Sequence, residues 1–198
     1  MGSERVTGGF AGVYKVLSAF EESGRCRRGY FVSGLGAAQF GTAGAIDRLR
    51  TFTELAPGAK PEAVALAATD PANPYGAALT WPDRTSADAE PEPAGRAGAG
   101  HRPGRKAGAM VVLVDGALSL YVERGGRTLL TFSDAPLVLG PACAALADAV
   151  RRGALGRLTV EKADGEQLLG RGDTGSPLRQ ALADAGFVTT PRGLRIRA

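Results

Sequence analysis

The stretch that most constrains how this chain can fold is residues 24–40, which read GRCRRGYFVSGLGAAQF. Residues 10–22 before it carry apolar side chains at helical spacing, which predicts an amphipathic helix. Residues 25–32 are basic and then aromatic, as suits a strand, and residues 34–36 supply the glycines of a turn. Residues 37–40 predict a returning strand. The local order is therefore a helix followed by a basic β-hairpin with a flexible tip.

This helix and hairpin match the end of a winged-helix domain. Phe10, Val13, Leu17 and Phe20 share one face of the predicted helix, and Gly24 is its predicted stop. In a winged-helix domain the last helix is followed by a wing, whose strand lies along a groove of the duplex with basic residues near phosphates. Nucleic acid is therefore the leading candidate partner.

The module is short of the helices that a complete winged helix requires. About two more helices would precede residue 10, and nine residues do so here. Either the module is incomplete or the chain is the end of something longer, and we favour the second interpretation. A short helix is also predicted at residues 42–52, so we expect a first domain over residues 1–56.

Residues 109–132 predict a β-meander. Asp115-Gly116 is a type I′ hairpin signal, and Gly125-Gly126 marks the next turn. Between these turns, Leu118, Leu120 and Val122 alternate with Ser119 and Tyr121, which predicts one apolar and one polar face.

The remaining patterns predict a second domain over residues 57–198. Residues 83–108 are rich in Ala, Gly, Pro and charge and predict a mobile excursion. Two helices are expected at residues 141–152 and 176–185, with Gly153 and Gly186 as stops. The expected strands are residues 63–69 (a buried strand), 109–114, 117–123, 127–132, 155–162, 187–190 and 194–197.

Charge and cysteine usage bound the classes of function. The net charge of +4 is mildly basic, and most of the cations are arginines, which suit phosphate and bases, although a coding bias toward arginine is the stronger explanation of the ratio taken alone. Cys26 and Cys143 lie far apart, which excludes a Cys-x-x-Cys zinc or redox motif. Neither a signal peptide nor an apolar run of about 18 residues occurs, so we expect a cytoplasmic, nucleoid-associated protein with no membrane partner.

The first candidate contact with nucleic acid is the cluster Arg25, Arg27 and Arg28 on the predicted wing. Alternation along a strand places Arg25 and Arg27 on one face. Each phosphate contact should add about 0.9 to the magnitude of the log–log salt slope. The competing interpretation is a solvated strand edge whose charges prevent aggregation.

The second candidate is the segment HRPGRK at residues 101–106, in which Arg102, Arg105 and Lys106 could form a flexible basic finger. The competing interpretation is a disordered surface loop. His101 is the single histidine of the chain and has no identifiable partner for catalysis or for a metal ion.

The third candidate is the C-terminal hairpin. Alternation places Arg195 and Arg197 together, with Arg192 nearby, and turns Leu194 and Ile196 inward. These arginines could extend a phosphate track. The competing interpretation is an ordinary charged outer face.

Catalytic patterns are scarce. Asp70 is a weak candidate, because Asp70-Pro71 could hold a carboxylate rigidly at a strand end or form an Asx turn that ends the strand. The chain lacks a G-x-x-x-x-G-K-[ST] phosphate loop, a His-Glu-x-x-His motif and a nucleophile elbow. No metal site and no cofactor are therefore expected in this chain.

Long phrases of the sequence resemble the C-terminal end of Lhr, the large helicase-related superfamily 2 helicases of bacteria. The resemblance implies upstream motor domains that use ATP and Mg²⁺, followed by winged-helix modules and a barrel-like module. On that mapping residues 10–40 end the last winged helix and residues 63–198 form the barrel-like module. The phrases are GRCRRGYFVSGLGAAQFGTAGAIDRLR, LAATDPANPYGAALTWP, HRPGRKAGAMVVLVDGALSLYVERGGRTLLTF and GRLTVEKADGEQLLGRGDTGSPLRQALADAGFVTTPRGLRIRA.

The same part of Lhr also resembles a bacterial DNA glycosylase family with a catalytic Gln-x-Gln or Gln-x-Asp motif. This chain departs from that motif at both of its candidate glutamines, Gln39 and Gln167. If base excision occurred, Asp70 would be the first candidate to activate water or to stabilise an oxocarbenium-like sugar.

The prediction is thus an α+β chain, a partial winged helix followed by a twisted antiparallel barrel-like sheet with two helices. Its expected function is to bind single-stranded or forked DNA as the C-terminal module of an Lhr-type helicase in DNA repair, beside the upstream helicase domains. A glycosylase-like module and a protein-interaction or oligomerisation module are the alternatives, so enzymatic activity of the chain is left open.

Overall fold

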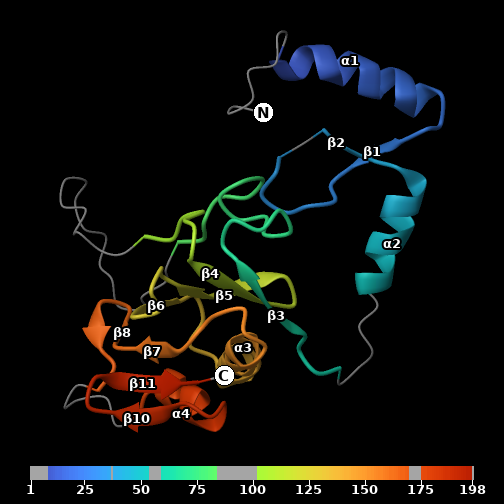
Figure 1. Ribbon diagram of the computed structural model, residues 1–198. Helices are drawn as coiled ribbons and strands as arrows, with labels where there is room; N and C mark the ends of the chain where they lie inside the picture. Colours follow the sequence, from blue (N-terminus) through green and yellow to red (C-terminus); the bar gives the residue numbers. More distant parts are fainter. Residues whose placement is uncertain (1–8, 37, 54–58, 84–101, 170–174, 198) are drawn as a thin grey trace, which may run out of the picture. The chain divides into compact units, whose positions relative to one another are not determined.

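The computed structural model has a mixed α+β architecture, with four helices and three sheets among the residues that it describes (Figure 1). The chain divides into two compact units, Met1–Ala59 and Lys60–Ala198. Most of the predicted mobile excursion lies outside the described residues, as does His101. The structure describes residues 9–36, 38–53, 59–83, 102–169 and 175–197.

The first unit contains two helices and a short antiparallel hairpin. Helix α1 spans Gly9–Glu22 and is followed by β1, Arg27–Gly29. Strand β2, Gln39–Gly41, pairs with β1 in a register that places Arg28 opposite Phe40. Helix α2 covers Ala43–Thr53. The predicted order of helix, basic hairpin and helix is confirmed, although the hairpin strands are shorter than expected.

The end of α1 explains the late start of β1. The Gly24 N–H donates to the Glu21 carbonyl, and the Arg25 N–H donates to the Phe20 carbonyl at 2.8 Å. This pair of bonds, with Gly24 at φ 72°, is a Schellman motif, and it confirms the predicted stop. Because Arg25 belongs to the helix terminus, the expectation that Arg25 and Arg27 share a strand face is wrong.

The second unit contains a six-stranded and a three-stranded sheet, ordered β3-β4-β5-β6-β8-β9 and β10-β11-β7. All strand pairs are antiparallel except β6 with β8, so the expected purely antiparallel sheet is corrected at that point. The order of the six-stranded sheet is open between β3 and β9, and the described residues form no closed barrel. The strands are β3 (Ala63–Ala67), β4 (Met110–Val114), β5 (Ala117–Val122), β6 (Thr128–Thr131), β7 (Leu158–Val160), β8 (Lys162–Ala163), β9 (Glu166–Gln167), β10 (Val188–Thr190) and β11 (Gly193–Ile196).

Strand β3 lies at the edge of the six-stranded sheet and pairs only with β4 among the described strands. Its burial pattern is mixed, and Val64 is 46% exposed. The expected buried strand is therefore a half-exposed edge strand. Three of its five residues are alanines, whose small side chains make the segment apolar without requiring a position in the core.

Helix α3 spans Pro136–Arg151 and packs against the sheet and against α4, Pro177–Asp184 (Figure 1). It begins five residues earlier than predicted, so Pro141 lies inside the helix. The proline that occupies the first turn is Pro136, where a missing N–H costs nothing. Leu139, Leu146 and Val150 of α3 are buried in the main core of the unit. No helix of the described segments is long and apolar enough to cross a bilayer.

The central strands β4 and β5 are buried on both faces, and a β-bulge between them decides which face each leucine of β5 occupies. The register between β4 and β5 shifts between Val112 and Leu113, so that Leu113 opposes Leu118 while Val112 opposes Leu120. Leu120 then packs in the main core, whereas Leu118 packs with Tyr121 in a second core on the other face. The predicted simple alternation is wrong here, because one extra residue reverses the facing of the chain.

Candidate nucleic-acid interface

The hairpin tip of the first unit is held by one side chain, Gln39. Its Oε1 accepts hydrogen bonds from the backbone N–H groups of Phe31 and Val32, at 3.0 and 2.8 Å. Its Nε2 donates to the carbonyls of Val32 and Gly36, at 2.9 and 2.8 Å. All four bonding positions of the amide are used in place of a longer strand ladder. In the sequence, Gln39 stands out only as a departure from a catalytic motif, and no local pattern predicts this role.

The three wing arginines are exposed but differ in what holds them. The Arg28 guanidinium donates to the Tyr14 hydroxyl at 2.7 Å and lies 3.5 Å from the Glu21 carboxylate. The Arg25 guanidinium lies over the Phe20 ring, 5.6 Å from its centroid. The Arg27 side chain extends from β1 into solvent and has no hydrogen-bond or ion-pair partner among the described residues. Arg27 is therefore the cation of this hairpin best placed to meet an external anion.

Arg105 of the predicted basic finger faces the protein. Its Nη1 donates to the Asn73 carbonyl at 2.7 Å, and its Nη2 donates to the carbonyls of Thr69 and Asp70, each at 3.0 Å. A longer bond of 3.4 Å reaches Tyr75. In this arrangement the guanidinium ties together the loop that follows β3. Its contact with nucleic acid stays a prediction.

The other two cations of this segment lie near the surface. Arg102 is exposed, and its carbonyl accepts a hydrogen bond from the Lys106 ammonium at 3.3 Å. Lys106 also lies 4.0 Å from the Glu123 carboxylate. Both side chains remain accessible to solvent, so their charges are available at the surface.

Asp70 has the geometry of an Asx turn. Its Oδ1 accepts a hydrogen bond from the Ala72 N–H at 2.8 Å, two residues along the chain. The same loop buries Asn73, whose amide donates to the Ala68 carbonyl at 2.9 Å. Among the described residues no group of three His, Cys, Asp or Glu side chains could hold a metal ion. The observed bonds give Asp70 a structural role, and its catalytic role stays a prediction.

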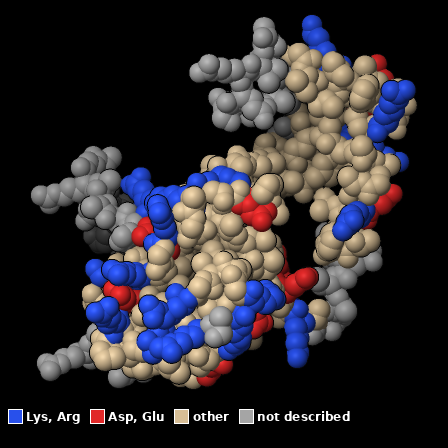
Figure 2. Space-filling view, in the orientation of Figure 1, with Lys and Arg blue, Asp and Glu red and all other residues tan. Residues whose placement is uncertain are grey.

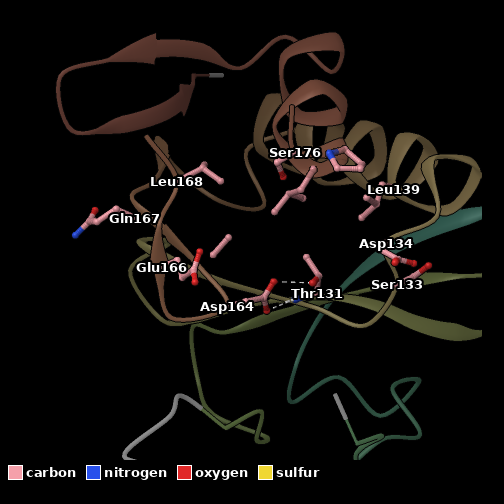
Figure 3. Close-up of a pocket in the computed structure, with 12 residues that line it drawn as sticks. Thr131, Ser133, Asp134, Leu139, Asp164, Glu166, Gln167, Leu168 and Ser176 are labelled. Carbon is pink, nitrogen blue, oxygen red and sulfur yellow. Dashed lines mark hydrogen bonds between the residues drawn. The ribbon is translucent and has the colours of Figure 1, made fainter. Parts of the chain in front are cut away.

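A polar pocket of about 390 Å³, which the sequence did not predict, lies between the β8–β9 turn and the start of α4 (Figure 3). Asp134, Asp164 and Glu166 contribute its carboxylates. The Asp164 side chain points at Thr131 and accepts bonds from its N–H at 2.9 Å and its hydroxyl at 2.6 Å. Asp164 thus fastens the β8–β9 turn to β6, and the acidic lining disfavours phosphate.

Cys143 and Tyr121 of the second unit have raised pKa values, and neither side chain supplies a reactive group. Burial raises the pKa of the Cys143 thiol to about 12, so the thiolate that would attack an electrophile is not formed near neutral pH. Burial also raises the pKa of the Tyr121 hydroxyl, which donates to the Gly104 carbonyl at 3.0 Å. Both side chains belong to the cores of the unit.

The C-terminal hairpin places its residues as alternation predicts. Leu194 and Ile196 of β11 are buried in the main core. Arg195 lies on the opposite face of the strand and is half-buried, and Arg197 is exposed just beyond the strand. The predicted inward pair is confirmed, and the arginines face away from the core.

Comparisons with known proteins place both units in one family. Residues 1–61 match the family described as the large helicase-related protein winged-helix domain. The whole chain is 49% identical over 201 residues to the Lhr helicase/probable uracil glycosylase of Mycolicibacterium smegmatis, and 97% of it is 36% identical to the Lhr helicase/uracil glycosylase of Escherichia coli. The chain spans 12% and 11% of the lengths of these two relatives. These matches confirm the resemblance: the chain belongs to the Lhr family and corresponds to a segment of an Lhr protein, with the Lhr winged-helix domain at its N-terminal end.

Proposed function

We propose that this chain is a DNA-binding module of an Lhr-type ATP-dependent helicase, acting beside the upstream motor domains in DNA repair. The observation that carries the proposal is the exposed basic hairpin inside the match to the Lhr winged-helix domain. Its tip is fixed by Gln39, so Arg27 is presented on an ordered hairpin, and Arg25 lies beside this hairpin at the end of α1. A winged-helix wing uses such cations to meet phosphates.

Binding of this kind is mainly electrostatic and weakly specific for sequence. Guanidinium groups on phosphates position a protein on nucleic acid, whereas contacts to base edges read the sequence. The candidate residues are arginines and one lysine on hairpins and loops, which suits single-stranded or forked DNA as well as duplex. We also propose that the second unit is a barrel-like module and that the protein is cytoplasmic and associated with the nucleoid.

The experiment is binding of the purified chain to fluorescent single-stranded, duplex and forked DNA over a salt series. An Arg25→Ala/Arg27→Ala variant removes two wing cations and spares Arg28, which contacts Tyr14 and Glu21. We expect the log–log salt slope to fall in magnitude by about 0.9 for each duplex phosphate that the wing no longer neutralises. Arg152→Ala removes one exposed charge at the end of α3 and serves as the control. A wild-type slope in the wing variant would contradict the role of the wing.

A second candidate function is base excision, because both relatives are named as uracil glycosylases. Asp70 would be the residue to test. Asp70→Asn keeps an oxygen that can accept from the Ala72 N–H, so the turn should survive while the carboxylate is removed. Release of uracil from DNA by the chain, abolished in this variant, would support the enzyme. Release that is unchanged in Asp70→Asn would exclude Asp70 as the catalytic group.

A further inference from the structure

The outer face of the three-stranded sheet in the second unit is hollowed into a basic groove of about 450 Å³. Arg127, Arg157, Arg192 and Arg195 line it, and Glu161 is the one carboxylate among its lining residues. Figure 2 shows Lys and Arg side chains gathered on the surface where Figure 1 places β7 and β11. We call these four arginines the groove arginines.

The fold assembles this groove from segments that are distant in the sequence. Arg195 lies on β11, the central strand of the sheet, opposite Thr159 of β7. Arg157 lies just before β7, two residues ahead of Thr159, and lines the same groove. Arg192 occupies the two-residue turn between β10 and β11, and Arg127 follows the β5–β6 turn. The sequence pattern alone predicts only that Arg192, Arg195 and Arg197 lie close together, on the C-terminal hairpin.

The charge of the groove is largely uncompensated. Glu161 pairs with Arg127, whose Nε lies 3.7 Å from the carboxylate. Within the described part of the chain, Arg157 and Arg192 have no ion-pair or side-chain hydrogen-bond partner. The Nε of Arg195 is buried and likewise has no hydrogen-bond partner among the described residues. A buried donor without a partner is costly, so this group is poised for an acceptor that enters the groove.

The backbone beneath the groove arginines is tightly fixed. Gly193 adopts φ +149°, and a Cβ at this position would overlap the Val160 carbonyl, so only glycine lets β11 approach β7 this closely. The Thr190 hydroxyl donates to the Gly193 carbonyl at 2.8 Å and closes the turn that carries Arg192. The guanidinium groups are thus displayed from a sheet and a tight turn, which limits the entropy cost of ordering them when they bind.

We propose that this groove binds the phosphodiester backbone of a nucleic acid, as a second phosphate site separate from the wing hairpin. Guanidinium forks match phosphate oxygens bidentately, and the Thr159 side chain in the groove lining adds a hydroxyl donor. The groove offers no aromatic platform among its lining residues, so it contacts the backbone and does not stack on bases. The proposal rests on the proposed DNA-binding function and assigns it a further site.

The test uses the full chain and a variant with Arg157→Ala and Arg192→Ala, two residues that make no structural bond that the substitution would break. The control is Arg48→Ala, which removes a positive charge from an exposed position on α2. We expect the double variant to bind DNA more weakly and its salt slope to fall in magnitude by about 0.9 for each duplex phosphate that the groove no longer neutralises. Arg48→Ala should leave both the affinity and the slope unchanged.

A direct readout is the Arg195 Nε–H resonance in a nitrogen-15 NMR spectrum. We expect an oligonucleotide to shift this resonance in the wild-type chain. A shift with inorganic phosphate or with polyglutamate but none with the oligonucleotide would overturn the proposal, because the groove would then hold free anions or acidic protein. A wild-type salt slope in the double variant, with the wing variant impaired, would overturn the groove and leave the proposed function standing. Failure of the wild-type chain to bind any DNA would instead remove the proposed function.

Discussion

The two units of this chain are stabilised in different ways. The second unit buries a large apolar core around α3 and a smaller one around Tyr121. In the first unit, Cys26 and Ile46 are the only apolar side chains of the described part that are buried, and each keeps a small exposed fraction. Several of its other apolar residues line an open groove of about 440 Å³, and others face solvent, with Tyr30 81% exposed and Phe52 61% exposed.

The first unit relies instead on specific polar and aromatic contacts. Gln39 fastens the hairpin tip, Arg28 joins the hairpin to α1, and the rings of Tyr14 and Phe40 meet edge to face at 5.7 Å. Each interaction of this kind contributes about 1 kcal/mol, whereas each fully buried leucine of the second unit contributes about 2 kcal/mol. The difference teaches that the basic hairpin is a locally ordered support on a small core, and that it should open more readily than the second unit.

The largest expected effect is on the second unit. Leu146 lies at the centre of α3 with no exposure, so Leu146→Ala leaves a cavity that should lower the free energy of unfolding of this unit by about 2–5 kcal/mol. Amide hydrogen exchange followed segment by segment would locate the destabilised region. Exchange in the first unit should not change. Equal acceleration in both units would show that they unfold as one and would break the comparison.

A smaller effect is expected for Arg105, whose guanidinium binds the carbonyls of the loop after β3. Arg105→Ala removes charge-assisted bonds and should lower the free energy of unfolding of the second unit by about 2 kcal/mol, measured by urea denaturation. Arg105→Lys keeps the charge but lacks the planar fork, so it should restore only part of the stability. Full stability in Arg105→Ala would mean that water replaces the guanidinium at no cost.

Arg105 also illustrates what the sequence could predict and what it could not. Gly24, Gly153 and Gly186 were predicted as helix stops, and each carries the positive φ of a C-terminal glycine. The Asp-Gly pair at residues 115–116 predicts a type I′ turn, and both residues adopt the positive φ that this turn requires. These features depend on neighbours within a few residues, so the local sequence suffices to predict them.

The features that the sequence did not predict depend instead on residues that are far apart in the chain. Arg105 binds the carbonyls of Asn73 and Thr69, which lie 32 and 36 residues away, and the groove arginines come from turns and strands within residues 127–195. The bulge between β4 and β5 depends on the pairing of two strands, and Pro141 lies within α3 because the helix begins earlier than its own pattern indicates. Tertiary packing decides such features, and a single sequence carries little local signal for them.

The next prediction concerns Gln39, where the first unit should be most sensitive. Gln39→Ala removes four hydrogen bonds at the hairpin tip, and we expect local opening to become easier by about 1 kcal/mol, with several-fold faster amide exchange at Val32. Gln39→Glu keeps acceptors for the Phe31 and Val32 N–H groups but cannot make either donated bond, so its effect should lie between those of the wild-type chain and Gln39→Ala. Unchanged exchange in both variants would show that the short ladder of β1 and β2 alone orders the tip.

The smallest effects on stability should separate two neighbouring arginines. Arg28 pairs with Glu21 and Tyr14, so Arg28→Ala should lower the free energy of unfolding of the first unit by up to about 1 kcal/mol, as an exposed ion pair does. Arg27 makes no such bond among the described residues, so Arg27→Ala should leave stability unchanged and reduce the magnitude of the salt slope of duplex binding by about 0.9. Thermal denaturation and a DNA titration on the same two variants would measure both quantities. The opposite result, in which Arg27→Ala altered stability and left the salt slope intact, would show that Arg27 has a structural role. The distinction between Arg28 as a stabilising residue and Arg27 as a phosphate-binding residue would then fail.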